Sequence, residues 1–223
     1  MSDKLPTKGF LAELSQLIVS EKNQHLDVVI MPWKQVMQGV ESGDLDGSVC
    51  MFKTEERKSR MYYIEPPLLI EQTVIFHRSD QIPQVTKLED LNQYRMGILD
   101  GSSYHKDEFI QQHPKLVDVN SFESMFKMLD KGRIDLILAE YRNGMAVISE
   151  TASLNPDHFS VLPYSYQHTD VHLVISHRIF DNQTVVQKLN SVAKRVINSP
   201  EAKALYKRHN ILQLPKLKPL SLQ

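Results

Sequence analysis

The sequence predicts an α/β protein of two lobes joined by two crossover strands. Short apolar, β-branched runs alternate with helical patterns along its 223 residues, an order typical of α/β architecture with largely parallel sheets. The segments SGDLDGSV (Ser42–Val49) and KGRIDLIL (Lys131–Leu138) share a helix end, a glycine, an aspartate and a strand, so one α-then-β unit is used twice. The segments VIFHR (Val74–Arg78) and VISHR (Val174–Arg178) match each other as well.

The second match sets the expected lobe boundaries. It fits a chain that leaves the first lobe near residue 77 and returns to it near residue 174, although two matches this short can also arise by chance. We therefore expect a discontinuous first lobe, residues 1–77 plus 174–223, and a continuous second lobe, residues 78–173.

Local patterns place the individual elements. Apolar residues at helical spacing after Gly9 predict the first helix, Gly43 is the left-handed residue that commonly ends a helix, and Thr54 is a helix N-cap. Helices are expected over 10–18, 36–41, from 54 onward, 104–112, 124–129, 184–196 and 200–209. Strands are expected over 28–31, 45–51, 73–76, 96–99, 134–139 and 171–175.

Composition excludes several classes of protein. With 41% hydrophobic and 24% charged residues the chain is ordinary globular material, and its formal net charge of −1 gives no basic stripe for nucleic acid. No apolar run approaches the ~20 residues that span a bilayer. Cys50 is the only cysteine, which rules out an intrachain disulfide and a cysteine-based metal site. No P-loop, dinucleotide, zinc-protease or hydrolase motif is present, so we expect no catalysis, cofactor or metal.

Arg57 is the first candidate site residue, because it conflicts with its own helix. Thr54, Glu55 and Glu56 suit a helix start, but Arg57 occupies the third helical position, where a capping box has Glu or Gln. A cation there opposes the helix dipole by about 0.3–1 kcal/mol. A bound carboxylate would offset this cost, since helix N–H groups and a forked guanidinium both bind anions. The alternative is an ion pair with a nearby glutamate on a solvated face.

Two further segments offer polar groups to a ligand. In MGILDGSSY a strand runs into Gly101, Ser102 and Ser103, a turn that can present N–H groups and hydroxyls to an anion, with plain N-capping by a serine as the alternative. Glu140 follows an apolar strand directly, at the end where ligands of open α/β sheets bind, and its carboxylate suits an ammonium group. The alternative for Glu140 is a turn residue that faces water.

Trp33 completes the set of candidates from residue patterns. It is the only tryptophan, follows Pro32 after a predicted strand, and either walls a pocket or covers the edge of the core. Together the candidates describe a cleft with an anion socket at one end and an acid at the other, which is complementary to an amino acid zwitterion.

These motifs resemble a known family. The stretch PWKQVMQGVESGDLDGSVCMFKTEERKSRMYYIEPP resembles the extracellular solute-binding proteins of family 3, the polar amino acid receptors of ABC importers. In that family P-W-K-R, a helix, a G-x-apolar-D segment, a strand and T-x-E-R follow in this order. EDLNQYRMGILDGSSY and MLDKGRIDLILAE resemble its later segments, so the likeness covers roughly residues 9–209.

The resemblance implies a type II periplasmic binding protein fold, with two α/β lobes, two crossover strands, and a ligand cleft between the lobes that closes by hinge bending. It implies that Arg57 clamps the ligand carboxylate, that Ser102 adds a contact to it, and that Glu140, where Asp is usual, binds the ammonium group. The other expected ligand-binding residues are Thr54, Phe52, Ser103 and Trp33.

The chain departs from the family pattern at two points. Family members begin with an export signal, a strand and an aromatic that lines the pocket, whereas this sequence starts near the first helix. We therefore expect a periplasmic protein with a truncated or miscalled start, or a paralogue. Phe52 stands where the family often has a small hydroxyl residue that contacts ligand, which weakens the case for a standard α-amino acid.

The leading hypothesis is a monomeric, non-enzymatic receptor that delivers a small carboxylate-bearing solute, such as a polar amino acid, to an ABC permease in the membrane. An enzyme similar to cyclohexadienyl dehydratase, with Glu140 as general acid, is the first alternative. A sensor or partner-binding paralogue without a transport role is the second.

Overall fold

The computed structural model describes residues 7–21, 24–179, 183–211 and 214–220. The chain divides into two compact units, each discontinuous in sequence. Unit 1 comprises Met1–Ile70 and Asp170–Leu214, and unit 2 comprises Glu71–Thr169 and Pro215–Gln223. The lobe boundaries expected at residues 77 and 174 stay a prediction; the compact units change over several residues earlier, and the last residues of the chain group with unit 2.

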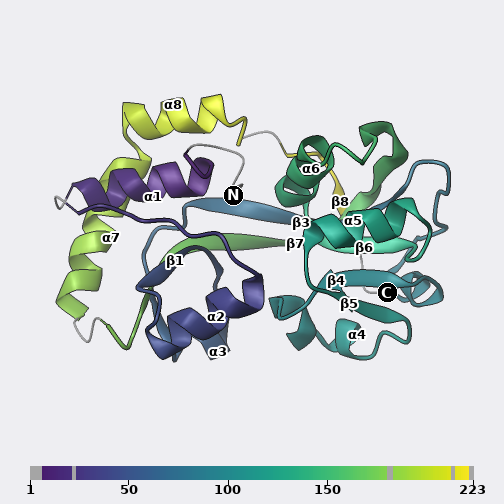
Figure 1. Ribbon diagram of the computed structural model, residues 1–223, viewed down its shortest axis with the longest axis horizontal. Helices are drawn as coiled ribbons and strands as arrows, with labels where there is room; N and C mark the ends of the chain where they lie inside the picture. Colours follow the sequence, from purple (N-terminus) through teal and green to yellow (C-terminus); the bar gives the residue numbers. More distant parts are fainter. Residues whose placement is uncertain (1–6, 22–23, 180–182, 212–213, 221–223) are drawn as a thin grey trace. The chain divides into compact units, whose positions relative to one another are not determined.

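Unit 1 holds a small antiparallel sheet between two groups of helices (Figure 1). β1 (Gly47–Phe52) and β2 (Met61–Tyr63) both pair with the second half of β7 (Phe159–Ser176). The helices of unit 1 are α1 (Phe10–Ser20), α2 (Trp33–Ser42), α3 (Glu55–Lys58), α7 (Gln183–Ile197) and α8 (Pro200–Arg208).

Apolar burial on both faces of this sheet stabilises unit 1. Helices α1, α7 and α8 bury their apolar faces with β1 and β7 in one cluster, which includes Phe10, Leu14, Val49, Leu173 and Val192. Helix α2 covers the opposite face, in a cluster that includes Val40, Met51, Met61, Tyr63 and Val174. Each such side chain contributes about 1.5–3 kcal/mol when fully buried. Successive residues of β7 point to opposite faces of the sheet, which divides its side chains between the two clusters.

Unit 2 is built on a mixed sheet. β3 (Leu69–Arg78) pairs antiparallel with β6 (Leu136–Glu140), and β4 (Met96–Leu99) pairs parallel with both β6 and β5 (Leu116–Val119). The other elements are η1 (Leu88–Gln93), η2 (Ser103–Lys106), α4 (Glu108–Gln111), α5 (Phe122–Asp130), α6 (Tyr141–Glu150), η3 (Pro156–His158) and β8 (Lys218–Pro219), which pairs with the first half of β7.

Helices α5 and α6 pack on this sheet and enclose the core of unit 2 (Figure 1). Phe76 of β3 meets Phe126 of α5 edge to face, with ring centroids 5.1 Å apart. Gly144 of α6 lies against both rings, and a Cβ atom at this position would come within 2.3 Å of Phe76. A glycine is therefore needed for α6 to approach β3 this closely.

Most of the predicted elements are confirmed, but the run Val28–Met31 is not a strand. It has no regular secondary structure, and Val29 is 64% exposed. No strand in the described part of the chain pairs with it. The prediction was wrong because β-branched composition gives only a propensity, whereas a strand also needs a neighbour for its N–H and C=O groups.

The helix predicted over 104–112 is interrupted. The 3₁₀ helix η2 ends at Lys106, and Asp107 starts α4 by accepting the N–H groups of Phe109 at 2.9 Å and Ile110 at 3.3 Å. An aspartate competes with the backbone in this way, which favours helix starts over helix interiors. The sequence patterns did not predict β2, β5 and α6, nor the short elements η1, η3 and β8.

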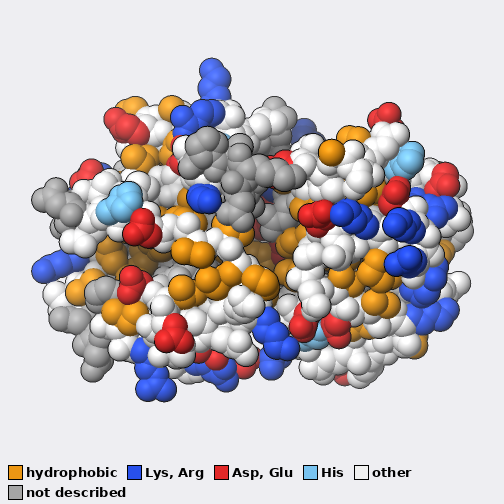
Figure 2. All heavy atoms as spheres, viewed as in Figure 1, with side chains coloured by type: hydrophobic (Ala, Val, Ile, Leu, Met, Phe, Trp, Pro, Cys, Tyr) orange, Lys and Arg blue, Asp and Glu red, His pale blue; other side chains and the backbone are white. Residues whose placement is uncertain are grey.

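Charged side chains of both signs are interspersed on the face drawn in Figure 2, with hydrophobic side chains between them. This mixture agrees with the formal net charge of −1. Among the helices of the described ranges, none has both the length and the apolar character required to traverse a bilayer.

Candidate functional site

Arg57 sits in the first turn of α3, in unit 1. Thr54 caps this helix, and its hydroxyl oxygen accepts the N–H of Arg57 at 3.3 Å. The Arg57 side chain turns inward and the residue is only 7% exposed. Its guanidinium donates one long hydrogen bond, 3.4 Å, to the carbonyl oxygen of Phe52, and lies over the ring of Trp33 with 5.6 Å to the centroid. Four of the predicted site residues therefore come together around α3.

Arg57 is a buried cation without a carboxylate partner among the described residues. The nearest acids, Glu41 and Glu56, lie beyond ion-pair distance from it, and both pair instead with Arg60, at 3.0 and 3.2 Å. Burial lowers the pKa of Arg57, because a charge in this position loses solvation. A guanidinium carries five N–H donors, and only one is used by the contacts described here, so the group can still bind an anion.

Tyr63 is a member of this cluster that is not among the predicted site residues. Its hydroxyl donates to the carbonyl oxygen of Phe52 at 2.9 Å, so this oxygen accepts from both Tyr63 and Arg57. Burial raises the pKa of Tyr63 to about 12, which keeps the hydroxyl protonated and able to donate. Phe52 thus contributes through its backbone, and no sequence pattern indicates a backbone contact of this kind.

Glu140 lies in unit 2, at the end of β6 and the start of α6, and is 8% exposed. One carboxylate oxygen accepts the hydroxyl of Tyr104 at 2.7 Å, and the other accepts the side-chain N–H of Asn143 at 3.3 Å. Tyr104 is also 3.0 Å from the hydroxyl of Thr73 in β3. The water-facing alternative for Glu140 therefore does not describe the structure, since the carboxylate is buried and hydrogen-bonded.

A second buried carboxylate, Glu71 of β3, lies beside the start of α6. It accepts the backbone N–H of Arg142 at 3.1 Å and forms an ion pair with the Arg142 guanidinium. Burial raises the pKa of Glu71, and the charge and hydrogen bonds of Arg142 oppose that shift. Unit 2 thus buries two carboxylates, Glu71 and Glu140, near one guanidinium.

The serine turn precedes Tyr104 directly. Ser102 is the residue before η2, yet its side chain makes no capping hydrogen bond, and its hydroxyl lies 3.4 Å from a ring nitrogen of His105. Ser103 begins η2, and both serines are partly exposed. The segment predicted to bind an anion therefore leads directly into Tyr104, which contacts Glu140, and anion binding by the two serines stays a prediction.

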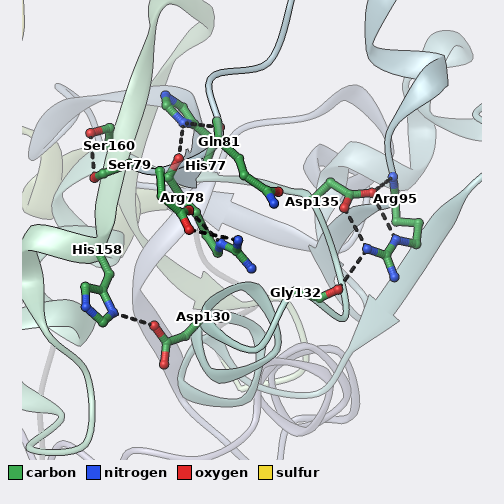
Figure 3. A network of polar contacts seen from close by, with 11 residues as sticks. His77, Arg78, Ser79, Gln81, Arg95, Asp130, Gly132, Asp135, His158 and Ser160 are labelled. Atoms are coloured by element: carbon green, nitrogen blue, oxygen red, sulfur yellow. Dashed lines mark hydrogen bonds and ion pairs between the residues drawn. The ribbon is translucent and has the colours of Figure 1, made fainter.

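The aspartate of the G-R-I-D motif has a different place (Figure 3). Asp135 accepts the backbone N–H of Arg95 at 2.8 Å and pairs with its guanidinium at 2.6 and 2.9 Å. Arg95 also donates to the carbonyl oxygen of Gly132 at 2.8 Å. This motif ties the turn before β6 to the start of β4, at the opposite strand ends from Glu140, so its aspartate is structural. Among the described residues, no group of three or more His, Cys, Asp or Glu could hold a metal ion.

Comparison with known proteins identifies the family. The sequence description of the bacterial extracellular solute-binding proteins, family 3, matches residues 1–211 of the chain. The chain belongs to this family. No protein of curated function matches the sequence.

Solved structures with a similar fold are found as well. A histidine kinase sensor domain with similarity to periplasmic binding proteins has a TM-score of 0.80 and 17% identity, covering 95% of this chain and 88% of that one. A mutant of ArgBP from T. maritima has a TM-score of 0.78 and 20% identity, covering 91% of this chain and 85% of that one. An ancestral arginine-binding protein bound to glutamine has a TM-score of 0.78 and 16% identity, covering 93% of this chain and 90% of that one. The predicted type II periplasmic binding protein fold is thereby confirmed.

Proposed function

We propose that this family 3 protein binds a polar amino acid or a close analogue, with Arg57 as the partner of the ligand carboxylate. The observation that carries the proposal is the state of Arg57: it is 7% exposed, and no carboxylate of the described residues lies within ion-pair distance. A buried charge is costly unless it is paired, so an anionic ligand is the partner that this position lacks.

The charges of unit 2 supply the second half of the argument. Glu71 and Glu140 are 5% and 8% exposed, and Arg142 offsets only one of these two charges. A carboxylate has about four acceptor positions, so Glu140 can accept further N–H groups beyond those of Tyr104 and Asn143. Arg57 thus suits a carboxylate and Glu140 suits an ammonium group, and an amino acid zwitterion carries both charges. The roles of Ser102, Ser103, Thr54 and Trp33, and a ligand enclosed by both units, stay predictions.

The same proposal includes delivery of the ligand to an ABC importer. Structures similar to this chain include the substrate-binding protein of an amino acid ABC transporter, and the S. pneumoniae protein AbpA bound to L-arginine, which has 18% identity and a TM-score of 0.75. These likenesses support a transport role, a membrane permease as partner and a periplasmic or extracellular site of action.

A thermal-shift screen of the twenty L-amino acids, polyamines and small carboxylates tests the binding proposal. A ligand at one hundred times its Kd stabilises the protein by about 2.7 kcal/mol, which is easily detected. We expect Arg57→Ala to abolish the shift given by an amino acid. The matched control is Arg60→Ala, which removes an exposed arginine three residues away, and it should keep the shift.

An undiminished shift in Arg57→Ala would remove Arg57 from the site, and absence of any shift across the screen would overturn the function. Turnover of prephenate or arogenate by the wild-type protein would favour the dehydratase alternative instead.

A further inference from the structure

The carboxylate of Glu140 does not cap the helix that starts at the next residue. Glu140 is the N-cap residue of α6, with extended backbone angles, yet its side chain makes no capping hydrogen bond. An acidic group near a helix N-terminus normally accepts one of the free N–H groups there. In this protein Glu71 of β3 accepts the N–H of Arg142 in its place.

Tyr104 accounts for where the Glu140 carboxylate goes instead. Thr73 and Glu140 are direct partners across the β3–β6 pair, so their side chains project from the same face of the sheet. The hydroxyl of Tyr104 lies between them, 3.0 Å from the Thr73 hydroxyl and 2.7 Å from a carboxylate oxygen of Glu140. All three residues are buried.

The donor and acceptor roles in these two hydrogen bonds are fixed. The Tyr104 hydroxyl has a single proton, and an ionised carboxylate can only accept, so Tyr104 donates to Glu140. Thr73 must then donate its own proton to the Tyr104 oxygen. Burial and the charge of Glu140 raise the pKa of Tyr104 well above its ordinary value, which keeps this proton in place.

We propose that Tyr104 is a positioning residue, which holds the carboxylate of Glu140 away from the start of α6 and in place to accept the ammonium group of the ligand. Glu71 makes this possible, because it takes over the capping of α6 that Glu140 gives up. Thr73 orients the Tyr104 hydroxyl. The inference rests on the proposed function, since it concerns how the same site selects an ammonium-bearing ligand.

A purely structural role of Tyr104 predicts a different outcome from a positioning role. If Tyr104 only stabilises unit 2, its loss should weaken all ligands alike. If Tyr104 positions Glu140, its loss should weaken ligands that carry the ammonium group and spare ligands that lack it. Selectivity for the ammonium group is therefore the quantity to measure.

The test measures Kd by calorimetry for two matched ligand pairs: L-glutamine with glutaramic acid, and L-arginine with 5-guanidinopentanoic acid, where the second member lacks the α-amino group. The variant is Tyr104→Phe, which removes only the hydroxyl. The matched control is Tyr94→Phe, because the Tyr94 hydroxyl accepts the N–H of Gln84 elsewhere in unit 2. Thr73→Val and Thr73→Ser form a second pair, without and with the hydroxyl.

We expect Tyr104→Phe to raise the Kd of the amino acid that binds by about tenfold, the effect of losing a hydrogen bond to a charged group. The Kd of its des-amino analogue should stay nearly unchanged. Tyr94→Phe should change neither Kd. Thr73→Val should lose part of the selectivity and Thr73→Ser should retain it.

Equal weakening of both members of a pair, or an unchanged Kd for the amino acid in Tyr104→Phe, would overturn the positioning role while leaving the proposed function intact. Failure of the wild-type protein to bind either amino acid would count against the proposed function for these ligands, and the inference would fall with it.

Discussion

Replacing Arg57 by methionine should stabilise the ligand-free protein. The variant Arg57→Met keeps a long side chain against Trp33 and removes a buried charge. In the structure that charge receives one hydrogen bond of 3.4 Å and one ring contact of 5.6 Å, and no ion pair within the described residues. A cation–π contact contributes about 0.5–2 kcal/mol, and a bond this long contributes less than an ordinary charged one.

Against these contributions stands the desolvation of a cation that is 7% exposed. Replacement of buried ionic groups by hydrophobic ones of similar volume often stabilises by about 1–4 kcal/mol. With the lost contacts subtracted, we expect a net gain of about 1 kcal/mol, or about 2–4 °C in Tm for a chain of this size.

The assay is urea and thermal unfolding of the ligand-free protein, with Arg60→Met as control. Arg60 pairs with Glu41 and Glu56 at the surface, so its loss should destabilise slightly, by roughly 0–1 kcal/mol. The reasoning is refuted if Arg57→Met destabilises the protein by more than its control does. Arg57 would then be a structural residue whose contacts outweigh its burial.

Three further outcomes follow from unit 2. Hydrogen bonds and the charge of Arg95 lower the pKa of Asp135 below its ordinary 3.8. The ionised carboxylate therefore stabilises the fold fully above pH 3.8, and this stabilisation is lost as the pH falls through the lowered pKa. In urea unfolding, the stability difference between wild type and Asp135→Asn at pH 7 should shrink at pH 3. Burial lowers the pKa of His113 below 6.5, so protonation of this residue favours the unfolded state. Between pH 7 and pH 5, His113→Gln should therefore lose less stability than wild type, and an equal loss would contradict this. Gly144→Ala should destabilise by about 1–3 kcal/mol, because its Cβ would meet Phe76 at 2.3 Å, and an unchanged urea midpoint would show that α6 can move away.

The fold class could be predicted because several independent signals agree. Helical spacing gives α1, Gly43 ends α2 in the left-handed conformation with φ of 90°, and Thr54 caps α3 as expected. Each of these signals is local, so a single sequence is enough to detect it. The run Val28–Met31 shows the limit, since strand formation there depends on a partner strand that propensity does not report.

The candidate site could be predicted only in part, for a similar physical reason. Arg57 and Glu140 are visible in sequence because each stands at an element end with an unusual charge. Tyr104, Thr73 and Glu71 are not visible, because their contacts join β3 to η2, β6 and α6, which lie far from β3 along the chain. Glu140 was expected after a strand, and the start of α6 at the next residue is what reveals the capping bond it does not make.

The central claim is that Arg57 binds the carboxylate of a polar amino acid or a close analogue. A crystal structure of the protein with the amino acid that binds best in the screen tests it most directly. The account predicts both carboxylate oxygens within hydrogen-bond distance of the Arg57 guanidinium. A ligand carboxylate bound elsewhere, with Arg57 still contacting only Phe52 and Trp33, would contradict it.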